Sequence, residues 1–265
     1  MPCAINPSIY GEVKKFSLLF RTAAPFPHIV IDNFLDESVA NALIENFPDN
    51  SSMHRCHHYL FANKRELSSW NKISSSFDSL HQNLLSEQFQ SFIRAISGED
   101  LFMDAEFCGD LHQGSDGGFL KMHTDFNLHP SQDTWVHRLN VMIYLNKNWQ
   151  QEYNGDLQLR KGLKGGIKEI SPVFNRCVIM LSDDTTYHGY TRLNLPQNMT
   201  RKSIVVHFYK EESPNKVPRR KMTTWAPDEE SFLLNENSTK LYNSLTSLKN
   251  RLLGSSAAYK AKRNK

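Results

Sequence analysis

His123 and Asp125 stand one residue apart at the end of an apolar stretch, and this pair constrains the fold more than any other feature of the chain. Residues two apart on a β-strand point to the same side, so both side chains can reach one metal ion while Thr124 faces away. Residues 119–122 lead into the pair like a short strand, and residues 126–130 lead toward a loop marked by proline. Alone, the pair is better explained by a solvated His and Asp at a loop edge.

A third candidate ligand, His188, follows the apolar run 177–181, which reads as a buried strand. It stands next to Gly189 beyond an acidic turn, a position from which a side chain can lean into a cleft. Taken alone, His188 is better explained as a structural residue. Together, two imidazoles and one carboxylate on one face of an octahedral Fe(II) leave three positions for a chelating cosubstrate and dioxygen.

Arg201 opens the β-prone segment 201–209, in which Arg201, Ser203 and Val205 fall on one face. A guanidinium binds a carboxylate through two parallel charge-assisted hydrogen bonds, and a hydroxyl two residues along the same face can add a third. The pattern therefore predicts an anchor for a buried dicarboxylate. Arg192, in an enlarged loop at 191–200, is a rival, but Arg201 is favoured because it opens a strand and is followed by Ser203.

With its parts in this order, the chain resembles the prolyl-4-hydroxylase-like branch of the Fe(II)/2-oxoglutarate-dependent dioxygenases. The stretches that carry the resemblance, besides the residues above, are 25–34, 138–149, 153–159 and 169–184. Scattered agreement in sequence order, over roughly residues 25–210, is more specific than any single motif. The resemblance implies a mainly β protein with flanking helices (α+β), built on a double-stranded β-helix (jelly-roll, cupin-like) core.

The resemblance also implies the site and its cofactors. The catalytic Fe(II) ligands are His123, Asp125 and His188. The residues that bind 2-oxoglutarate are Arg201, Tyr144, Ser203, Leu157 and, from its place on the Tyr144 strand face, Asn140. O2 is the second cosubstrate, and ascorbate is a candidate reductant. The chain departs from the family in one respect: it lacks a tyrosine that some relatives place about ten residues before the first ligand. Gln113 stands near that position here.

The implied reaction hydroxylates an unactivated C–H bond of a protein side chain, prolyl included, or of a small molecule, with release of succinate and CO2. Asp125 favours hydroxylation, since an open position in its place would let a halide bind iron. Two alternatives stay open: a non-enzymatic jelly-roll binding module, and a zinc-dependent hydrolase with the same three ligands, which Arg201 and Ser203 do not explain. The sequence leaves the substrate and the oligomeric state open.

Composition predicts one catalytic domain with terminal additions, because 265 residues that are 39% hydrophobic can bury one good core. We expect an N-terminal strand with support helices (1–100), the jelly-roll core (101–212) and a helical extension with a basic tail (213–265). A net charge of +3 gives no reason to expect a nucleic-acid partner. The basic segments 216–221 and 260–265 are interpreted as solvated.

Cys3, Cys56, Cys108 and Cys177 show no paired spacing, so neither disulfides nor a structural zinc site is expected. No apolar stretch is long enough to cross a membrane and no signal peptide is evident, which predicts a cytoplasmic protein without membrane partners. One crowded group of ligands, His54, Cys56, His57 and His58, is a weak zinc candidate because it lacks a second cluster. A surface loop near the mouth of the active site is the better interpretation.

The segments outside the core carry helix signals. We expect a strand over 28–34, then a helix capped by Asp36, polar loops over 50–76 and a helical stretch over 77–93. Near the C-terminus, four leucines share one helical face, which we expect to pack on the core before Gly254 ends the helix. They are Leu241, Leu245, Leu248 and Leu252.

Overall fold

The computed structural model describes residues 3–228 and 232–253. Its strands are β1 (His28–Ile31), β2 (Arg55–Tyr59), β3 (Ala62–Ser68), β4 (Phe102–Met103), β5 (Gly109–Gly114), β6 (Phe119–Thr124), β7 (Trp135–Tyr144), β8 (Leu157–Lys161), β9 (Lys168–Ile170), β10 (Arg176–Leu181), β11 (Thr186–Tyr190), β12 (Arg201–Glu211) and β13 (Thr224–Trp225). Its α-helices are α1 (Ser8–Gly11), α2 (Val13–Thr22), α3 (Glu37–Glu45), α4 (Ser75–Leu85), α5 (Glu87–Ser97) and α6 (Glu236–Leu253).

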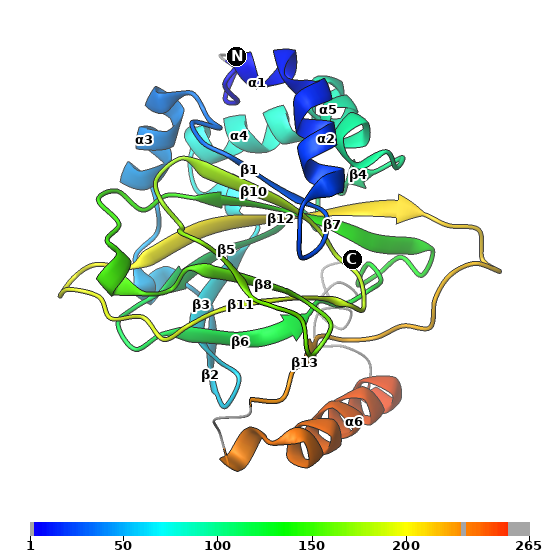
Figure 1. Cartoon of the computed structure of the whole chain (residues 1–265). Helices are drawn as coiled ribbons and strands as arrows, with labels where there is room; N and C mark the ends of the chain where they lie inside the picture. The colour runs from blue at the N-terminus through cyan, green and yellow to red at the C-terminus, as the bar shows by residue number, and fades with distance from the viewer. Residues whose placement is uncertain (1–2, 229–231, 254–265) are drawn as a thin grey trace.

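Within the described residues the strands pair into one antiparallel sheet that curls back on itself (Figure 1). One layer has the order β1-β10-β7-β12-β5-β3, and the facing layer has the order β6-β11-β8-β9. β3 also pairs with β6, so it connects the two layers at one side. The arrangement is a double-stranded β-helix, as the sequence predicted.

Alternation along the central strands separates two cores. In β7, Val141 and Ile143 pack toward the helices, whereas Met142 and Tyr144 pack between the two layers. The same alternation holds in β10 and β12, because successive side chains of a strand point to opposite faces. The helices α1 to α5 cover the outer face of the first layer (Figure 1). The inner face is left to line a pocket.

The N-terminal elements largely follow their sequence signals. β1 lies within the predicted strand, and an oxygen of Asp36 accepts hydrogen bonds from the backbone N–H groups of Ser38 and Val39 at the start of α3. The helical stretch predicted over 77–93 is two helices, because Ser86 leaves the helical conformation and its hydroxyl caps α5 at Phe89.

The prediction of loops over 50–76 is wrong, since β2 and β3 form an antiparallel hairpin there. β3 then lies between β5 and β6 and is part of the main sheet. Its inward residues Lys64 and Glu66 are charged because they face a polar pocket. The strand therefore lacks the apolar alternation by which strands are usually identified.

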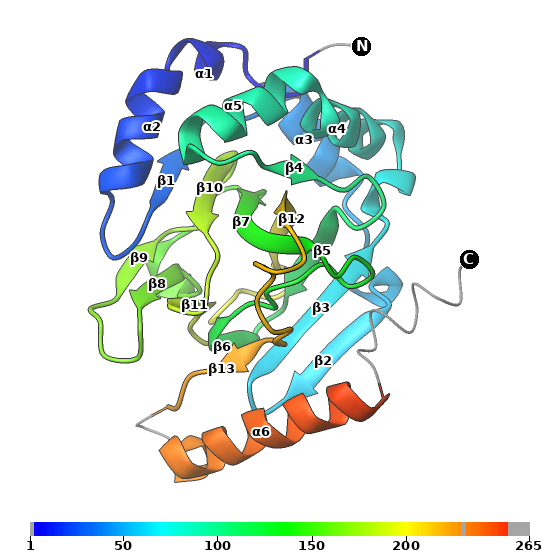
Figure 2. The same ribbon diagram turned by 90° about the vertical axis from the view of Figure 1, so that its right-hand side faces the viewer.

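The C-terminal segment crosses back over the sheet after β12. β13 pairs with β6, and α6 lies at the opposite end of the molecule from the other helices (Figures 1 and 2). The division of the chain at residues 100 and 212 stays a prediction. No helix in the described part of the chain is long and apolar enough to span a membrane.

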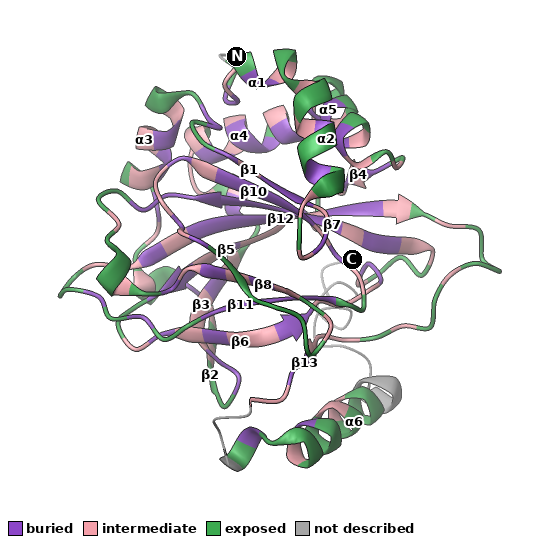
Figure 3. Ribbon diagram, in the orientation of Figure 1, coloured by how far each residue is buried: buried purple, intermediate pink, exposed green. Residues whose placement is uncertain are grey.

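The prediction that the leucine face of α6 packs on the core is wrong. Leu241, Leu245 and Leu248 are 61%, 57% and 51% exposed, and most of α6 is exposed (Figure 3). The helix is attached instead by Tyr242, whose ring lies 4.8 Å from that of Phe61, and by Asn243. The side chain of Leu252, Gly254 and the basic tail lie outside the described residues. Periodicity shows which residues share a face, but not which face meets the core.

Candidate metal centre and cosubstrate pocket

The three predicted metal ligands converge at one end of the second layer. His123 in β6 and His188 in β11 are direct partners in the strand register, and their ring centroids are 4.3 Å apart. Asp125 follows β6, with Oδ1 3.5 Å from Nε2 of His123 and Oδ2 3.7 Å from Nε2 of His188. The three ligand atoms all lie within 4.8 Å of one another, as a single bound cation requires.

Their protonation states fit a divalent cation. Nδ1 of His123 lies 2.9 Å from the backbone oxygen of Lys121, which can only accept, so Nε2 keeps a free lone pair. Burial lowers the pKa of His188 to about 3, which leaves this imidazole neutral. Burial acts to raise the pKa of Asp125, but the polar groups around this carboxyl outweigh burial and hold its pKa well below the usual range. Two imidazoles and one carboxylate are the donor set that suits Fe(II).

Gly189 lets the two histidine strands approach closely. A Cβ atom at this position would lie 2.5 Å from the backbone oxygen of Leu120 and 2.9 Å from the backbone of Lys121. No side chain fits between β11 and β6 here, so the glycine beside His188 sets the distance between the two imidazoles.

Gly189→Ala should push β11 away from β6 and separate His188 from His123. We expect a loss of about 1–3 kcal/mol in the free energy of unfolding, the usual cost of overpacking, together with weaker Co(II) binding. Thermal denaturation and an absorbance titration with Co(II) measure the two effects. Gly166→Ala is the matched control, because a Cβ there meets nothing within 4 Å. Equal behaviour of the two variants would contradict this role for Gly189.

Asn140 holds the metal-binding carboxylate. Its amide nitrogen donates to Oδ2 of Asp125 at 2.6 Å. Its amide oxygen accepts from Nε2 of His137 at 3.0 Å and from Nδ1 of His207 at 2.8 Å. The side chain lines the pocket, as predicted for a cosubstrate residue, but all of these hydrogen bonds are made to the protein.

Arg201 lies at the other end of the same pocket and is 5% exposed. Its Nε donates to the backbone oxygen of Gly155 at 2.8 Å, and its guanidinium lies 4.2 Å from the ring centroid of Tyr190 and 5.1 Å from that of Tyr144. Among the described residues no carboxylate forms an ion pair with it. A buried cation without an acidic partner is costly, so this end of the pocket is suited to an anion.

One pocket of about 260 Å³ joins the metal ligands to Arg201. The other predicted cosubstrate residues that line it are Tyr144, Leu157, Ser203 and Asn140. The rival Arg192 is exposed, donates to the backbone oxygen of Gly117 and does not line the pocket. The structure therefore brings together every predicted site residue and separates Arg192 from them.

Sequence reasoning missed a charged wall of this pocket. His112 lines the pocket, whereas its neighbour Gln113 does not. Glu66 lies opposite, with its oxygens 2.7 Å from Nζ of Lys64 and 2.8 Å from Nη2 of Arg55. Glu66, Asp110 and His112 are also close enough to share a cation, but the two basic side chains already neutralise the carboxylates. Tyr190 was also missed, although it shares a strand face with His188.

The crowded group of His and Cys residues at positions 54–58 lies mainly on the surface. His57 is in β2 and its Nε2 lies 2.9 Å from Glu66, whereas His54, Cys56 and His58 are exposed. They form no zinc cluster among the described residues.

In the segment 129–135, His129 is buried and its Nε2 lies 2.9 Å from Oδ2 of Asp104. His207 lines the pocket.

Comparison with known proteins agrees with this geometry. Residues 109–209 match the model of the 2OG-Fe(II) oxygenase superfamily. No curated protein sequence matches the chain.

Solved structures share the fold. A prolyl hydroxylase from Trichoplax adhaerens, in complex with a peptide fragment of hypoxia inducible factor, has a TM-score of 0.59 at 16% identity, covering 76% of this chain and 90% of that one. A prolyl-4-hydroxylase from Pseudomonas putida has a TM-score of 0.55 at 15% identity, covering 76% and 100%. HygX from Streptomyces hygroscopicus, with nickel, 2-oxoglutarate and hygromycin B bound, has a TM-score of 0.50 at 13% identity, covering 74% and 86%.

The family match spans all three metal ligands and Arg201, and the fold is that of prolyl hydroxylases. The binding-module and zinc-hydrolase alternatives are therefore not favoured. The cofactors of this superfamily are Fe(II), 2-oxoglutarate and O2, which the donor set described above accommodates. Residues 109–209 therefore form a 2OG-Fe(II) oxygenase domain, on a fold that is shared with prolyl hydroxylases.

Proposed function

We propose that His123, Asp125 and His188 bind Fe(II), and that Arg201 binds the distal carboxylate of 2-oxoglutarate in a reaction that hydroxylates a C–H bond of the substrate. The observation that carries the proposal is that a buried arginine, which has no acidic partner among residues 3–228 and 232–253, shares one pocket with the three ligands. A dicarboxylate that spans the pocket satisfies both ends. A zinc hydrolase would have no use for the buried cation.

The other pocket residues position the cosubstrate. Ser203 lies two residues along the strand from Arg201 and can donate a hydroxyl hydrogen bond to the same carboxylate. Tyr144 and Tyr190 flank the guanidinium and keep it in one orientation, and Leu157 supplies an apolar surface for the carbon chain. When bound, Fe(II) and 2-oxoglutarate supply the oxidative chemistry, which consumes O2 and releases succinate and CO2. The protein contributes orientation and exclusion of water.

Asn140 is proposed to orient the Asp125 carboxylate rather than to bind 2-oxoglutarate. Asn140→Leu should weaken Co(II) binding by about 10- to 100-fold, the usual effect of removing a hydrogen-bond partner of a metal ligand. The affinity for 2-oxoglutarate at saturating metal should change much less. Both constants come from absorbance titrations. A selective loss of 2-oxoglutarate affinity with unchanged metal affinity would instead make Asn140 a cosubstrate residue.

The function is tested first without knowledge of the substrate. Anaerobic addition of Fe(II) and 2-oxoglutarate to the protein should produce a visible charge-transfer band, and admission of O2 should produce succinate slowly. If folded, iron-loaded protein gives no band, the proposed cosubstrate site is wrong.

The substrate is a protein or a small molecule. Of the structures with this fold, the Trichoplax enzyme is in complex with a peptide and HygX with hygromycin B, so the fold accommodates both classes. A prolyl substrate, ascorbate as the reductant, a cytoplasmic location and the absence of a nucleic-acid partner stay predictions.

A further inference from the structure

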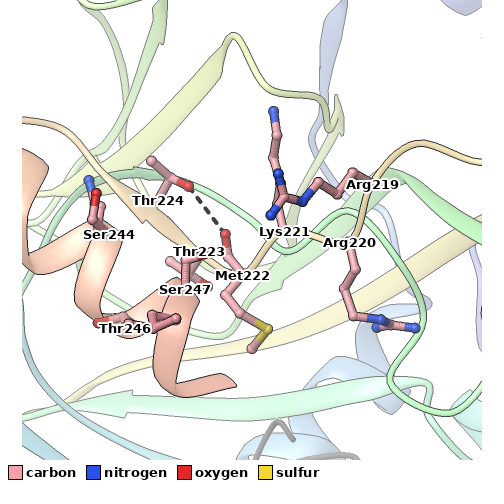
Figure 4. A pocket seen from close by; sticks show the side chains of 11 residues that line it. Arg219, Arg220, Lys221, Met222, Thr223, Thr224, Ser244, Thr246 and Ser247 are labelled. Carbon is pink, nitrogen blue, oxygen red and sulfur yellow. Dashed lines mark hydrogen bonds between the residues drawn. The ribbon is translucent and has the colours of Figure 1, made fainter. Parts of the chain in front are cut away.

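A second cavity lies beside the metal pocket, between residues 219–224 and helix α6. It has a volume of about 390 Å³ (Figure 4). We call it the basic groove. Its lining residues are Arg219, Arg220, Lys221, Met222, Thr223, Thr224, Asn243, Ser244, Thr246, Ser247 and Leu248. In Figure 4 the basic side chains lie on one side and the helix with Ser244 and Ser247 on the other.

The lining contains three cations and no carboxylate. Arg219 is exposed and forms no ion pair within the described residues. Lys221 pairs with Asp184, whose side chain is 55% exposed, and such surface pairs contribute little and exchange readily. Arg220 differs, since it donates to the backbone oxygen of His129 and pairs with Asp133, which ties the segment to the neighbouring loop. Arg219 and Lys221 are therefore the cations available to a ligand.

Hydroxyl groups supply the rest of the polar lining. Thr223, Ser244, Thr246 and Ser247 come from the two sides of the groove, and in the described part of the chain their side chains form no hydrogen bond with the protein. Each hydroxyl can donate to an anion. A tetrahedral phosphate group, with three terminal oxygens, can accept from two cations and several hydroxyls at once, whereas a carboxylate has only two oxygens to share.

The groove adjoins the metal pocket. Thr223 lines both cavities. The next residues, Thr224 and Trp225, pair with Thr124 and His123 in the β13–β6 ladder, and the ring of Trp225 lies 5.0 Å from that of His123. A ligand held in the groove therefore lies beside the short strand β13, which pairs with the ligand-bearing strand β6. The interpretation of the basic segment 216–221 as merely solvated does not account for this placement.

We propose that the basic groove binds the phosphate group of a phosphorylated small-molecule substrate, whose carbon to be hydroxylated enters the metal pocket. The hydroxylation of the bound molecule rests on the proposed function, whereas the binding of a phosphate ester in the groove does not depend on it. A small molecule is indicated because the groove has the volume of one ligand site.

The test measures where a simple phosphate ester binds. The protein is loaded with 2-oxoglutarate and either Co(II) or Zn(II), so that Arg201 is occupied, and glycerol 3-phosphate is added with glycerol as the uncharged comparison. We expect saturable calorimetric binding of glycerol 3-phosphate alone. Faster ³¹P relaxation with paramagnetic Co(II) than with diamagnetic Zn(II) would place the phosphorus near the metal. No saturable binding, or binding with equal relaxation rates, overturns the proposal.

Two variants and a control assign the binding to this groove. Arg219→Glu/Lys221→Glu should weaken glycerol 3-phosphate binding by about 10-fold or more, and Ser244→Ala/Ser247→Ala should weaken it without a change in charge. Lys14→Glu/Lys15→Glu in α2 gives the same change in net charge and should have no effect. Equal loss in this control, or full binding by both groove variants, overturns the assignment. Thermal denaturation shows whether each variant is folded.

The same samples separate this proposal from the function on which it rests. If the anaerobic Fe(II) and 2-oxoglutarate band appears but no phosphate ester binds, the proposed phosphate site is wrong and the proposed oxygenase site is retained. If a phosphate ester binds but the band does not appear, the oxygenase site is wrong and the phosphate site is retained. Glycerol 3-phosphate should also bind less tightly as the salt concentration rises, because the groove is open to solvent.

Discussion

Arg201→Met should weaken 2-oxoglutarate binding by roughly 100-fold or more, because removing one partner of a buried, charged pair costs about 3–5 kcal/mol. Methionine fills much of the same space between Tyr144 and Tyr190, so the fold should be retained. Metal affinity should be almost unchanged, since Arg201 touches none of the three ligands. The measurement is a titration with 2-oxoglutarate at saturating Fe(II), followed by the charge-transfer band under anaerobic conditions.

Arg192→Met is the matched control for this prediction. Arg192 is an exposed arginine of the adjoining loop and lies outside the pocket. Its replacement should leave the 2-oxoglutarate affinity within experimental error. If the effects of the two substitutions were reversed, the carboxylate anchor would have to be reassigned to the 191–200 loop.

Asp125→Ala should lower metal affinity by more than about 100-fold, because loss of a mere hydrogen-bond partner of a ligand already costs about 10- to 100-fold. His188 and His123 alone leave a divalent cation without an anionic donor. The Fe(II) and 2-oxoglutarate band and succinate formation should disappear together. Direct metal analysis of dialysed protein and the anaerobic titration measure the loss.

Asp100→Ala removes an exposed carboxylate elsewhere and is the control for this substitution. It should keep full metal content and the band. Retention of tightly bound iron by Asp125→Ala would show that another carboxylate completes the site, and Glu66 and Asp110 line the same pocket.

The parts of the fold that could be predicted from the sequence are the strands with a continuous apolar run. β7, β10 and β12 contain such runs, because their two faces pack into two different cores. The one-residue spacing of His123 and Asp125, and the shared face of Arg201 and Ser203, also depend only on the two-residue period of a strand. These local rules predicted residues that line one pocket in the structure.

The parts that could not be predicted depend on long-range pairing. β3 has charged residues on its inward face because β5 and β6 surround it with a polar pocket, which is not visible from its own sequence. His112 rather than Gln113 faces the site because the pairing of β5 with β12 decides which of its side chains point into the pocket. A shift of the pairing by one residue would turn every side chain of β5 to the opposite face of the sheet. The position of α6 depends on Tyr242 and Asn243, which periodicity does not distinguish from solvent-facing residues.

The position of β3 between β5 and β6 has a practical consequence for recombinant fragments. A fragment trimmed to residues 109–209 would contain the three metal ligands and Arg201, yet it would lack this strand. β5 and β6 would then each present a row of unpaired backbone N–H and C=O groups, the usual origin of edge-to-edge aggregation. A fragment that keeps this pairing must therefore begin before β3, well outside the segment by which the family is recognised.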